Sequence, residues 1–269
     1  MPHSYPVLPS LSCSKSLMHT VTISPDRCRL MSYGYGSWSD SISVVAILKA
    51  WYQLAIEEIG YNAFTGTIPV EFSLLSNLKY LDISNCSLSG PLPRELGDLT
   101  KLDALYLFKN KFNGEIPVSY TKLKALKVLD LSGNQLSGTI PQELASLTEL
   151  TWLSLIDNNL SGTIPQGIGE LPNLDTLLLW DNYFSGILPQ KLGSNGKFLS
   201  LDVSTNSLTG PIPRNLCHGN KLFKLILFNN MFTHELPGSL VKCTLLSRLR
   251  IQNNILNGTI PLGFGHLKI

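Results

Sequence analysis

The chain has 269 residues, of which 43% are hydrophobic and 15% charged, and its net charge is +2. Such near balance leaves no electrostatic footprint for nucleic acid or an acidic membrane surface, so we expect no nucleic-acid partner. No stretch reaches the roughly 18 apolar residues of a membrane span, and the N-terminus lacks the basic start and apolar run of a secretory signal.

Residues 1–49 are rich in serine, carry scattered aromatic residues and show no repeat. Because this region has no repeat on which to stack, we leave it unassigned and expect it to be disordered. We assign residues 50–269 to a single repeat domain.

A pattern of 24 residues defines that domain. Glycine recurs at this spacing from Gly66 to Gly258, with His234 as the one interruption. Around each glycine the chain reads L-x-x-L-x-L-x-x-N-x-L-S-G-x-I-P, as in "LTWLSLIDNNLSGTIP" at residues 150–165. Nine successive copies identify leucine-rich repeats. The predicted fold is an α/β repeat, a right-handed solenoid that is uncapped at both ends.

The first half of each repeat alternates with a period of two, which predicts a short strand with inward leucines. Stacked in register, these strands should form one parallel ladder on the concave face. The "L-S-G-x-I-P" half resembles that of plant extracellular repeats, and this resemblance implies a second, lateral strand. The ladder strands should centre on Leu81, Leu105, Leu129, Leu153, Leu177, Leu201, Leu225 and Leu249.

An asparagine occupies the ninth position of most repeats and turns inward after the strand. Its amide can satisfy backbone groups of adjacent turns, so we predict a buried, hydrogen-bonded column. Cys86 takes this place once, and in the first repeat Glu57 stands where a core leucine belongs. The column comprises Asn62, Asn110, Asn134, Asn158, Asn182, Asn206, Asn230 and Asn254.

The residues between the leucines should face the concave surface. Large rings and arginines occur there, and these residue types dominate binding hot spots. The fifth position is acidic in early repeats and basic in the last, which matches an extended peptide with opposite charges at its ends. A plain scaffold face is the alternative, since exposed rings can pack against neighbours in the ladder. The candidate peptide-binding residues are Glu58, Asp82, Tyr106, Phe108, Asp130, Trp152, Trp180, Asp202, Phe228, Arg248 and Arg250.

Several segments resemble one family of plant receptors. "SNLKYLDISNCSLSGPLP", "LCHGNKLFKLILFNNMF" and "IQNNILNGTIPLGFG" are similar to ectodomains of the leucine-rich repeat receptor kinases for CLE/TDIF-class peptides. The resemblance implies perception of a secreted peptide at the extracellular side of the plasma membrane, in vascular development, with a SERK-type co-receptor. In this family an Arg-x-Arg motif on a concave strand holds the carboxylate of the peptide's last residue, and Arg248 and Arg250 match that motif.

The family's signal peptide, N-terminal cap, later repeats, transmembrane helix and kinase have no counterpart in this sequence. The co-receptor surface of the family lies largely in those later repeats. Neither a glycine-rich phosphate loop nor an H-R-D or D-F-G motif occurs, so we expect no enzyme activity. The sequence therefore predicts a peptide-binding receptor fragment. A non-signalling scaffold or decoy and a defence-related protein-binding module are the alternatives.

Cysteine and histidine spacings match no metal site, and we predict neither a metal nor a cofactor. Cys217 and Cys243 lie at positions 20 and 22 of consecutive repeats, which stacking brings close. A disulfide is therefore plausible in a secreted chain, and two buried small side chains are the alternative. Three glycosylation sequons begin at Asn85, Asn159 and Asn257 and become acceptors only in the secretory pathway.

Overall fold

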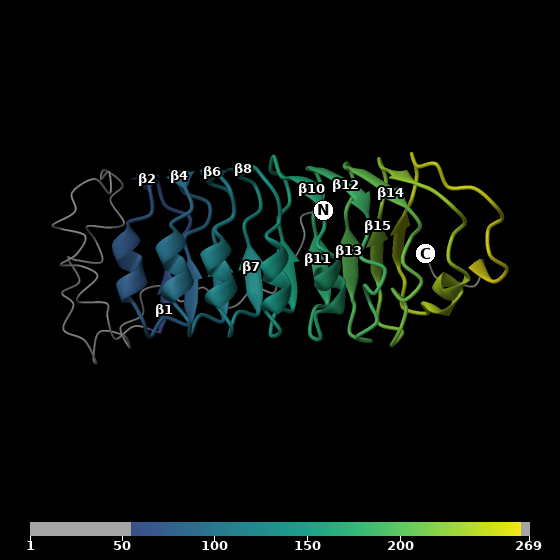
Figure 1. The fold of residues 1–269 in the computed structure, drawn as a ribbon, viewed down its shortest axis with the longest axis horizontal. Helices are drawn as coiled ribbons and strands as arrows, with labels where there is room; N and C mark the ends of the chain where they lie inside the picture. Colours follow the sequence, from purple (N-terminus) through teal and green to yellow (C-terminus); the bar gives the residue numbers. More distant parts are fainter. Residues whose placement is uncertain (1–54, 265–269) are drawn as a thin grey trace. The chain divides into compact units, whose positions relative to one another are not determined.

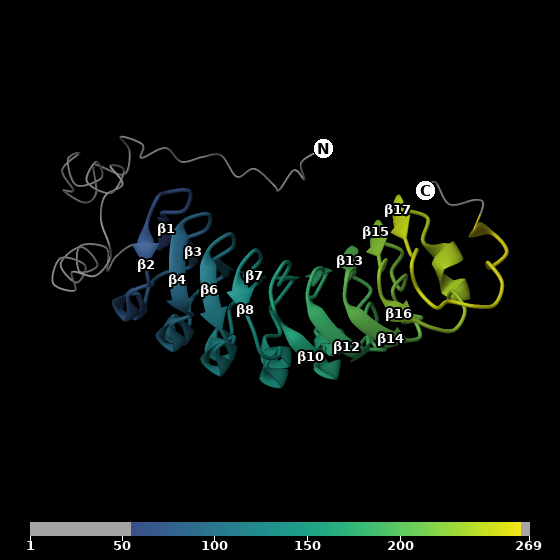
Figure 2. The ribbon, with the colours of Figure 1, turned by 90° about the horizontal axis from the view of Figure 1, so that it is seen from above.

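The computed structural model describes residues 55–264, which form a solenoid of stacked turns within one compact unit (Figure 1). The expected disorder of residues 1–49 lies outside the described residues. In Figure 2 the odd-numbered strands follow the inner curve of the solenoid and the 3-10 helices follow the outer curve. None of the helices in residues 55–264 has the length and apolar character needed to cross a membrane.

The inner face is a sheet of nine parallel strands in sequence order. Neighbouring strands pair residues exactly one repeat apart, as Leu153 with Leu177, because every turn has the same length. The predicted strand centres and the ladder are confirmed. The strands are β1 Ile56–Glu58, β3 Tyr80–Asp82, β5 Ala104–Tyr106, β7 Val128–Asp130, β9 Trp152–Ser154, β11 Thr176–Leu178, β13 Ser200–Asp202, β15 Lys224–Ile226 and β17 Arg248–Arg250.

Lateral strands form two further parallel sheets of four strands each, as the resemblance implied. The first sheet contains β2 Thr65–Gly66, β4 Ser87–Pro91, β6 Lys111–Gly114 and β8 Gln135–Leu136. The second contains β10 Ser161–Thr163, β12 Tyr183–Ile187, β14 Ser207–Gly210 and β16 Met231–Phe232.

Six of the outer segments form 3-10 helices of five residues, those at 190–195 and 214–219 form turns, and no α-helix occurs between residues 55 and 264. Each of these helices begins directly after a proline with φ between −56° and −64°. The short outer segment of a 24-residue repeat leaves room for little more than one helical turn. The helices are η2 Val70–Leu74, η3 Arg94–Asp98, η4 Val118–Lys122, η5 Gln142–Ser146, η6 Gln166–Glu170 and η7 Gly238–Lys242.

The asparagine column lies beside the leucine core and joins adjacent turns. The side-chain amide of Asn158 donates to the carbonyls of Leu131, Leu155 and Ile156 at 3.1–3.2 Å, and its oxygen accepts from the N–H of Leu136 at 3.0 Å. Six other asparagines repeat this arrangement, which confirms the hydrogen-bonded column at seven of its eight predicted positions: Asn110, Asn134, Asn182, Asn206, Asn230 and Asn254. Asn62, at the eighth position, donates to carbonyls of its own turn, those of Ile59 and Gly60, at 3.0 Å. Asn62, Asn134, Asn206 and Asn254 are half-buried and not buried as predicted.

The eighth position, just before the asparagine, adopts a left-handed backbone in all nine repeats. This conformation turns the chain from the strand into the core, and asparagine, aspartate and glycine tolerate it best. Tyr61, with φ of 58°, is the bulkiest residue held this way. The nine residues are Tyr61, Asn85, Lys109, Gly133, Asp157, Asp181, Thr205, Asn229 and Asn253.

Cys217 and Cys243 form a disulfide in the outer part of consecutive repeats. Their Cα atoms are 5.4 Å apart, both residues are buried, and Cys86 is the free cysteine of the described region. Cys243 directly follows η7, so the bridge ties this helix to the preceding turn.

We expect a non-reducing digest of secreted protein to yield Cys217 and Cys243 in one linked fragment and Cys86 as a labelled thiol. Cys217→Ala should lower the free energy of unfolding by about 2–4 kcal/mol, because the bridge closes a 26-residue loop. Mass spectrometry and denaturant unfolding measure the two effects. Alkylation of both cysteines without prior reduction would contradict the bridge.

Glu57 lies at a leucine position of the first ladder strand and is only 8% exposed. Burial, and secondarily the charge of Glu58, raises the pKa of Glu57 from 4.5 to about 7. The folded state therefore holds a proton that the unfolded chain releases above pH 4.5. The stabilisation from that proton is complete below 4.5 and is lost as the pH rises through 7.

We expect amide exchange in β1, corrected for intrinsic rates, to accelerate between pH 4.5 and 7. Glu57→Leu should remove this dependence and slow exchange at pH 7. Glu58→Gln is the control and should retain most of this pH dependence, since burial is the larger cause of the raised pKa of Glu57. Equal pH profiles for the unmutated chain and Glu57→Leu would refute the assignment.

Tyr120, in η4, is completely buried, and its hydroxyl has no hydrogen-bond partner among the described residues. An unpaired buried hydroxyl costs about 1–3 kcal/mol. Tyr120→Phe should therefore raise the free energy of unfolding by about 1 kcal/mol in a urea titration. A loss of stability in this variant would mean that the hydroxyl bonds to ordered water.

Candidate functional site: the inner strand ladder

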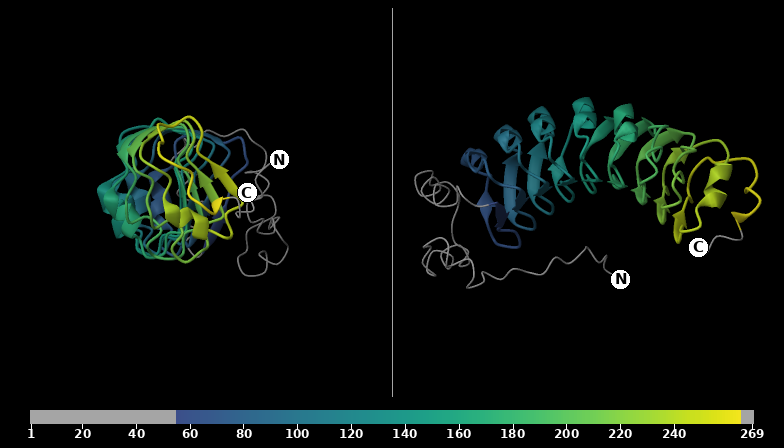
Figure 3. Two further views of the ribbon diagram at one scale, coloured as in Figure 1. Left: turned by 90° about the vertical axis from the view of Figure 1, so that its right-hand side faces the viewer. Right: turned by 90° about the horizontal axis from the view of Figure 1, so that it is seen from below.

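The inner face of the ladder carries all the candidate peptide-binding residues, either within its strands or two residues after them. Seen from below in Figure 3, the inner strands line the side opposite the 3-10 helices. Among the candidates, Glu58, Trp180, Arg248 and Arg250 are exposed, Asp82, Tyr106, Phe108, Trp152 and Phe228 are half-buried, and Asp130 and Asp202 are buried.

The C-terminal end of the ladder is cationic. Arg248 and Arg250 flank Leu249 in β17, and both point to the open face because side chains two apart in a strand share a side. Neither guanidinium has an ion-pair or hydrogen-bond partner in the part of the chain that the structure describes. Lys224, in β15, is the register partner of Arg248. It differs in being paired, with its Nζ 3.1 Å from an Oδ2 atom of Asp202.

The aspartates of the ladder are held by serines two residues later. Asp130 accepts from the N–H and hydroxyl of Ser132 at 3.0 and 2.6 Å. Asp202 accepts from the N–H and hydroxyl of Ser204 at 3.3 and 2.7 Å. Asp82 accepts from the N–H and hydroxyl of Ser84 in the same way.

Two of these aspartates are less open than their place in the repeat suggests. Asp130 is 3% exposed and Asp202 7%. Burial raises the pKa of Asp130, while the hydrogen bonds from Ser132 act in the opposite direction. The spacing Asp-x-Ser is visible in the sequence and is the signal that predicts local engagement of these carboxylates.

Four aromatic rings form a cluster at the N-terminal end of the ladder. Tyr106 contacts Phe108 edge-on with ring centroids 6.4 Å apart, and Tyr80 lies 5.3 Å from Tyr106. Tyr61 reaches Phe108 from its left-handed turn at 6.3 Å. Burial is the main cause of the raised pKa of Tyr106, followed by the charges of Asp130 and Asp82. Tyr106 and Phe108 are among the candidates predicted from the sequence, whereas Tyr61 and Tyr80 are not.

The three sequon asparagines are exposed but lie in different surroundings. Asn85 follows β3 in the left-handed position beside the ladder face. Asn159 lies just before β10, on the lateral side. Asn257 lies in the last described repeat. A glycan at Asn85 would therefore compete with a ligand on the ladder, whereas one at Asn159 would not.

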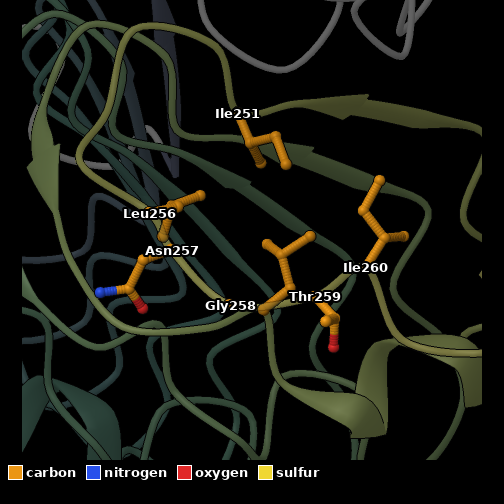
Figure 4. Close-up of a pocket in the computed structure, with 7 residues that line it drawn as sticks. Ile251, Leu256, Asn257, Gly258, Thr259 and Ile260 are labelled. Atoms are coloured by element: carbon orange, nitrogen blue, oxygen red, sulfur yellow. The ribbon is translucent and has the colours of Figure 1, made fainter.

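A hollow of 220 Å³ lies at the last described repeat (Figure 4). Its lining residues include Ile251 and Leu256, whose equivalents one repeat earlier, Leu227 and Phe232, are fully buried under the next turn. The hollow is thus lined by core positions at the edge of the described residues. No group of three or more acidic, histidine or cysteine side chains suited to a metal occurs in residues 55–264.

The repeats of this chain are similar to those of known proteins. Models described as leucine-rich repeat match residues 116–160 and 77–99. The crystal structure of a TDR receptor is 65% identical, with a TM-score of 0.81 over 82% of this chain and 38% of that one. The Arabidopsis receptor kinase HAESA, in complex with the peptide hormone IDA and the co-receptor SERK1, is 38% identical, with a TM-score of 0.78 over 81% of this chain and 36% of that one.

Receptor-like protein 41 of Arabidopsis thaliana is 33% identical over 82 residues, which are 30% of this chain and 9% of that protein. The chain therefore spans well under half the length of these three proteins. The matching regions are receptor ectodomain repeats and not catalytic domains. The chain belongs to the leucine-rich repeat proteins, and its described residues form a solenoid of the kind found in plant receptor ectodomains.

Proposed function

We propose that this chain is a peptide-binding part of a plant receptor, and that it binds a CLE/TDIF-class secreted peptide along the inner ladder. The peptide's terminal carboxylate would lie on Arg248 and Arg250. The observation that carries the proposal is the pair of exposed, unpartnered guanidinium groups on one face of β17. Two such groups can each donate paired hydrogen bonds to a carboxylate.

The described ladder is long enough to hold an extended ligand of about a dozen residues. Nine strands about 4.8 Å apart span roughly 38 Å from β1 to β17. Twelve extended residues cover roughly 40 Å at about 3.3 Å each. A peptide of this length could therefore place one end at β1 and the other at β17.

The charges at the two ends of the ladder support one orientation. Glu58 is exposed and Asp82 half-buried at the N-terminal end, where a peptide amine would be stabilised. Asp130 and Asp202 are covered, so we assign them a contribution to the local field and to the shape of the face. The remaining candidate rings, on Tyr106, Phe108, Trp152, Trp180 and Phe228, would supply apolar contacts.

The similar structures support the class of ligand and partner. The HAESA structure is a complex with a peptide hormone and a co-receptor, and the TDR receptor shares 65% of its aligned residues with this chain. By similarity to these proteins, we propose a SERK-type co-receptor as a second partner of this chain. A place on the extracellular side of the plasma membrane, and a role in vascular development, belong to the same proposal.

The rival functions are those of a scaffold, a decoy or a defence-related module that binds a folded protein. Such a partner would cover a broad area and would not depend on a free terminal carboxylate. The chemistry of the ligand's last residue therefore separates the peptide receptor from these alternatives.

We expect Arg248→Ala combined with Arg250→Ala to weaken binding of a CLE-class peptide by about 30-fold or more. The scale follows from charge-assisted hydrogen bonds of about 1.5–3 kcal/mol each and about 1.4 kcal/mol per tenfold change in Kd. Amidation of the peptide's C-terminus should weaken binding to the unmutated chain and have little further effect on the double variant. Calorimetry on the four combinations measures this coupling.

Arg214→Ala is a control for the loss of a surface arginine, because Arg214 is exposed and lies beyond β14 in the segment leading to the outer side. It should bind the peptide as tightly as the unmutated chain does. Strictly additive effects of amidation and the double substitution would show that the arginines do not hold the carboxylate.

A further inference from the structure

The cationic end of the ladder contains a third positive side chain, that of Lys224, which is engaged in an ion pair. Lys224 in β15 is the register partner of Arg248, so the two side chains leave neighbouring strands on the same face. Adjacent strands lie about 4.8 Å apart, which puts Lys224 within reach of a ligand group held over β17. Its ion pair with Asp202 directs the ammonium group back toward β13.

The Lys224–Asp202 pair is well enclosed compared with the other ion pairs of the described residues. The side chains of Lys224 and Asp202 are 18% and 10% exposed, whereas the other four pairs are exposed at the surface, with values from 33% to 84%. Water screens an enclosed pair less, so its geometry is more persistent. Ser204 fixes the other carboxylate oxygen of Asp202 and thereby its orientation.

We propose that Asp202 is a specificity-determining residue: by engaging Lys224, it limits the cationic end of the ladder to recognition of the terminal carboxylate and weakens recognition of an acidic side chain near the ligand's C-terminus. The inference rests on the proposed function and adds the residue that sets which C-terminal sequences bind.

The charges near β17 explain why the pair has this effect. Arg248 and Arg250 contribute two positive charges that a carboxylate can meet with paired hydrogen bonds. Lys224 would add a third, but Asp202 offsets it at a distance of 3.1 Å. Without the carboxylate of Asp202, the ammonium group becomes available to a second anion on the ligand.

The part of the ligand that faces Lys224 follows from the spacing of the ladder. An extended peptide advances about 3.3 Å per residue, and one step between strands is about 4.8 Å. A peptide whose carboxylate lies over β17 therefore carries its last or penultimate side chain over β15. An aspartate at one of these two positions is the probe that senses Lys224.

The experiment compares three synthetic CLE-class peptides: one with asparagine at both of its last two positions, and two with aspartate at the last or at the penultimate position. Calorimetry gives the ratio of the Kd values for the asparagine and aspartate forms on each protein variant. Asp202→Asn should shift this ratio toward an aspartate form by about five- to tenfold, the size of one added charge contact at a partly screened surface. Asparagine retains an oxygen that accepts from Ser204, so the ladder should keep its shape.

Two further variants separate this effect from a general change in charge. The same substitution with Lys224→Met should produce a shift of less than about twofold, because the ammonium group is missing. Asp130→Asn removes a carboxylate held by Ser132 in the same Asp-x-Ser arrangement but without a lysine partner. It should leave the ratio unaltered, whatever it does to the affinity for all three peptides.

The proposal would be overturned by an unchanged ratio in Asp202→Asn. It would also be overturned by an equal shift in the double variant with Lys224→Met or in Asp130→Asn. Either result would leave the peptide-binding function intact. If none of the peptides binds the unmutated chain, the proposed function fails first and this inference fails with it. The two failures are thus distinguishable in one set of titrations.

Discussion

The hydrogen bonds of the asparagine that follows the strand in all but one of the described repeats are the interaction on which the rest of the solenoid depends. Each turn ends its strand with carbonyl groups that face the core, where water cannot reach them. An unpaired backbone group there would cost about 1–3 kcal/mol. The asparagine amide meets carbonyls of its own turn and of the preceding turn, and its oxygen accepts an N–H of the preceding repeat, as Asn158 shows. These bonds fix the stacking register.

Because the register is fixed, the inner face becomes a regular array. A residue at a given position of one repeat lies beside the same position in the next, so Lys224 meets Arg248 and Ile226 meets Arg250. Short strands of three residues present only two side chains each to the open face. The chemistry of that face therefore follows from a few columns of residues, while the leucines and asparagines behind it stay constant.

Local partners decide which charges on the face remain available. Asp130, Asp202 and Lys224 are charged residues at outward positions, yet all three are engaged within the protein. Arg248 and Arg250 occupy equivalent positions without such partners in the described region. Enclosed pairs contribute to the shape and field of the surface. Guanidinium groups without such partners keep their donors available, and this difference makes the C-terminal end of the described ladder strongly cationic.

The sequence by itself determined the fold, eight of the nine strand centres and the asparagine column, because a 24-residue period leaves one way to bury the leucines. It also put Arg248 and Arg250 on one face, since side chains two apart in a strand point the same way. Only the tertiary structure decided which outward residues are open. The enclosure of Asp202 by Lys224, and the approach of Tyr61 to Phe108, depend on side chains from different turns. Periodicity gives the column of a residue but not the contacts that its side chain makes there.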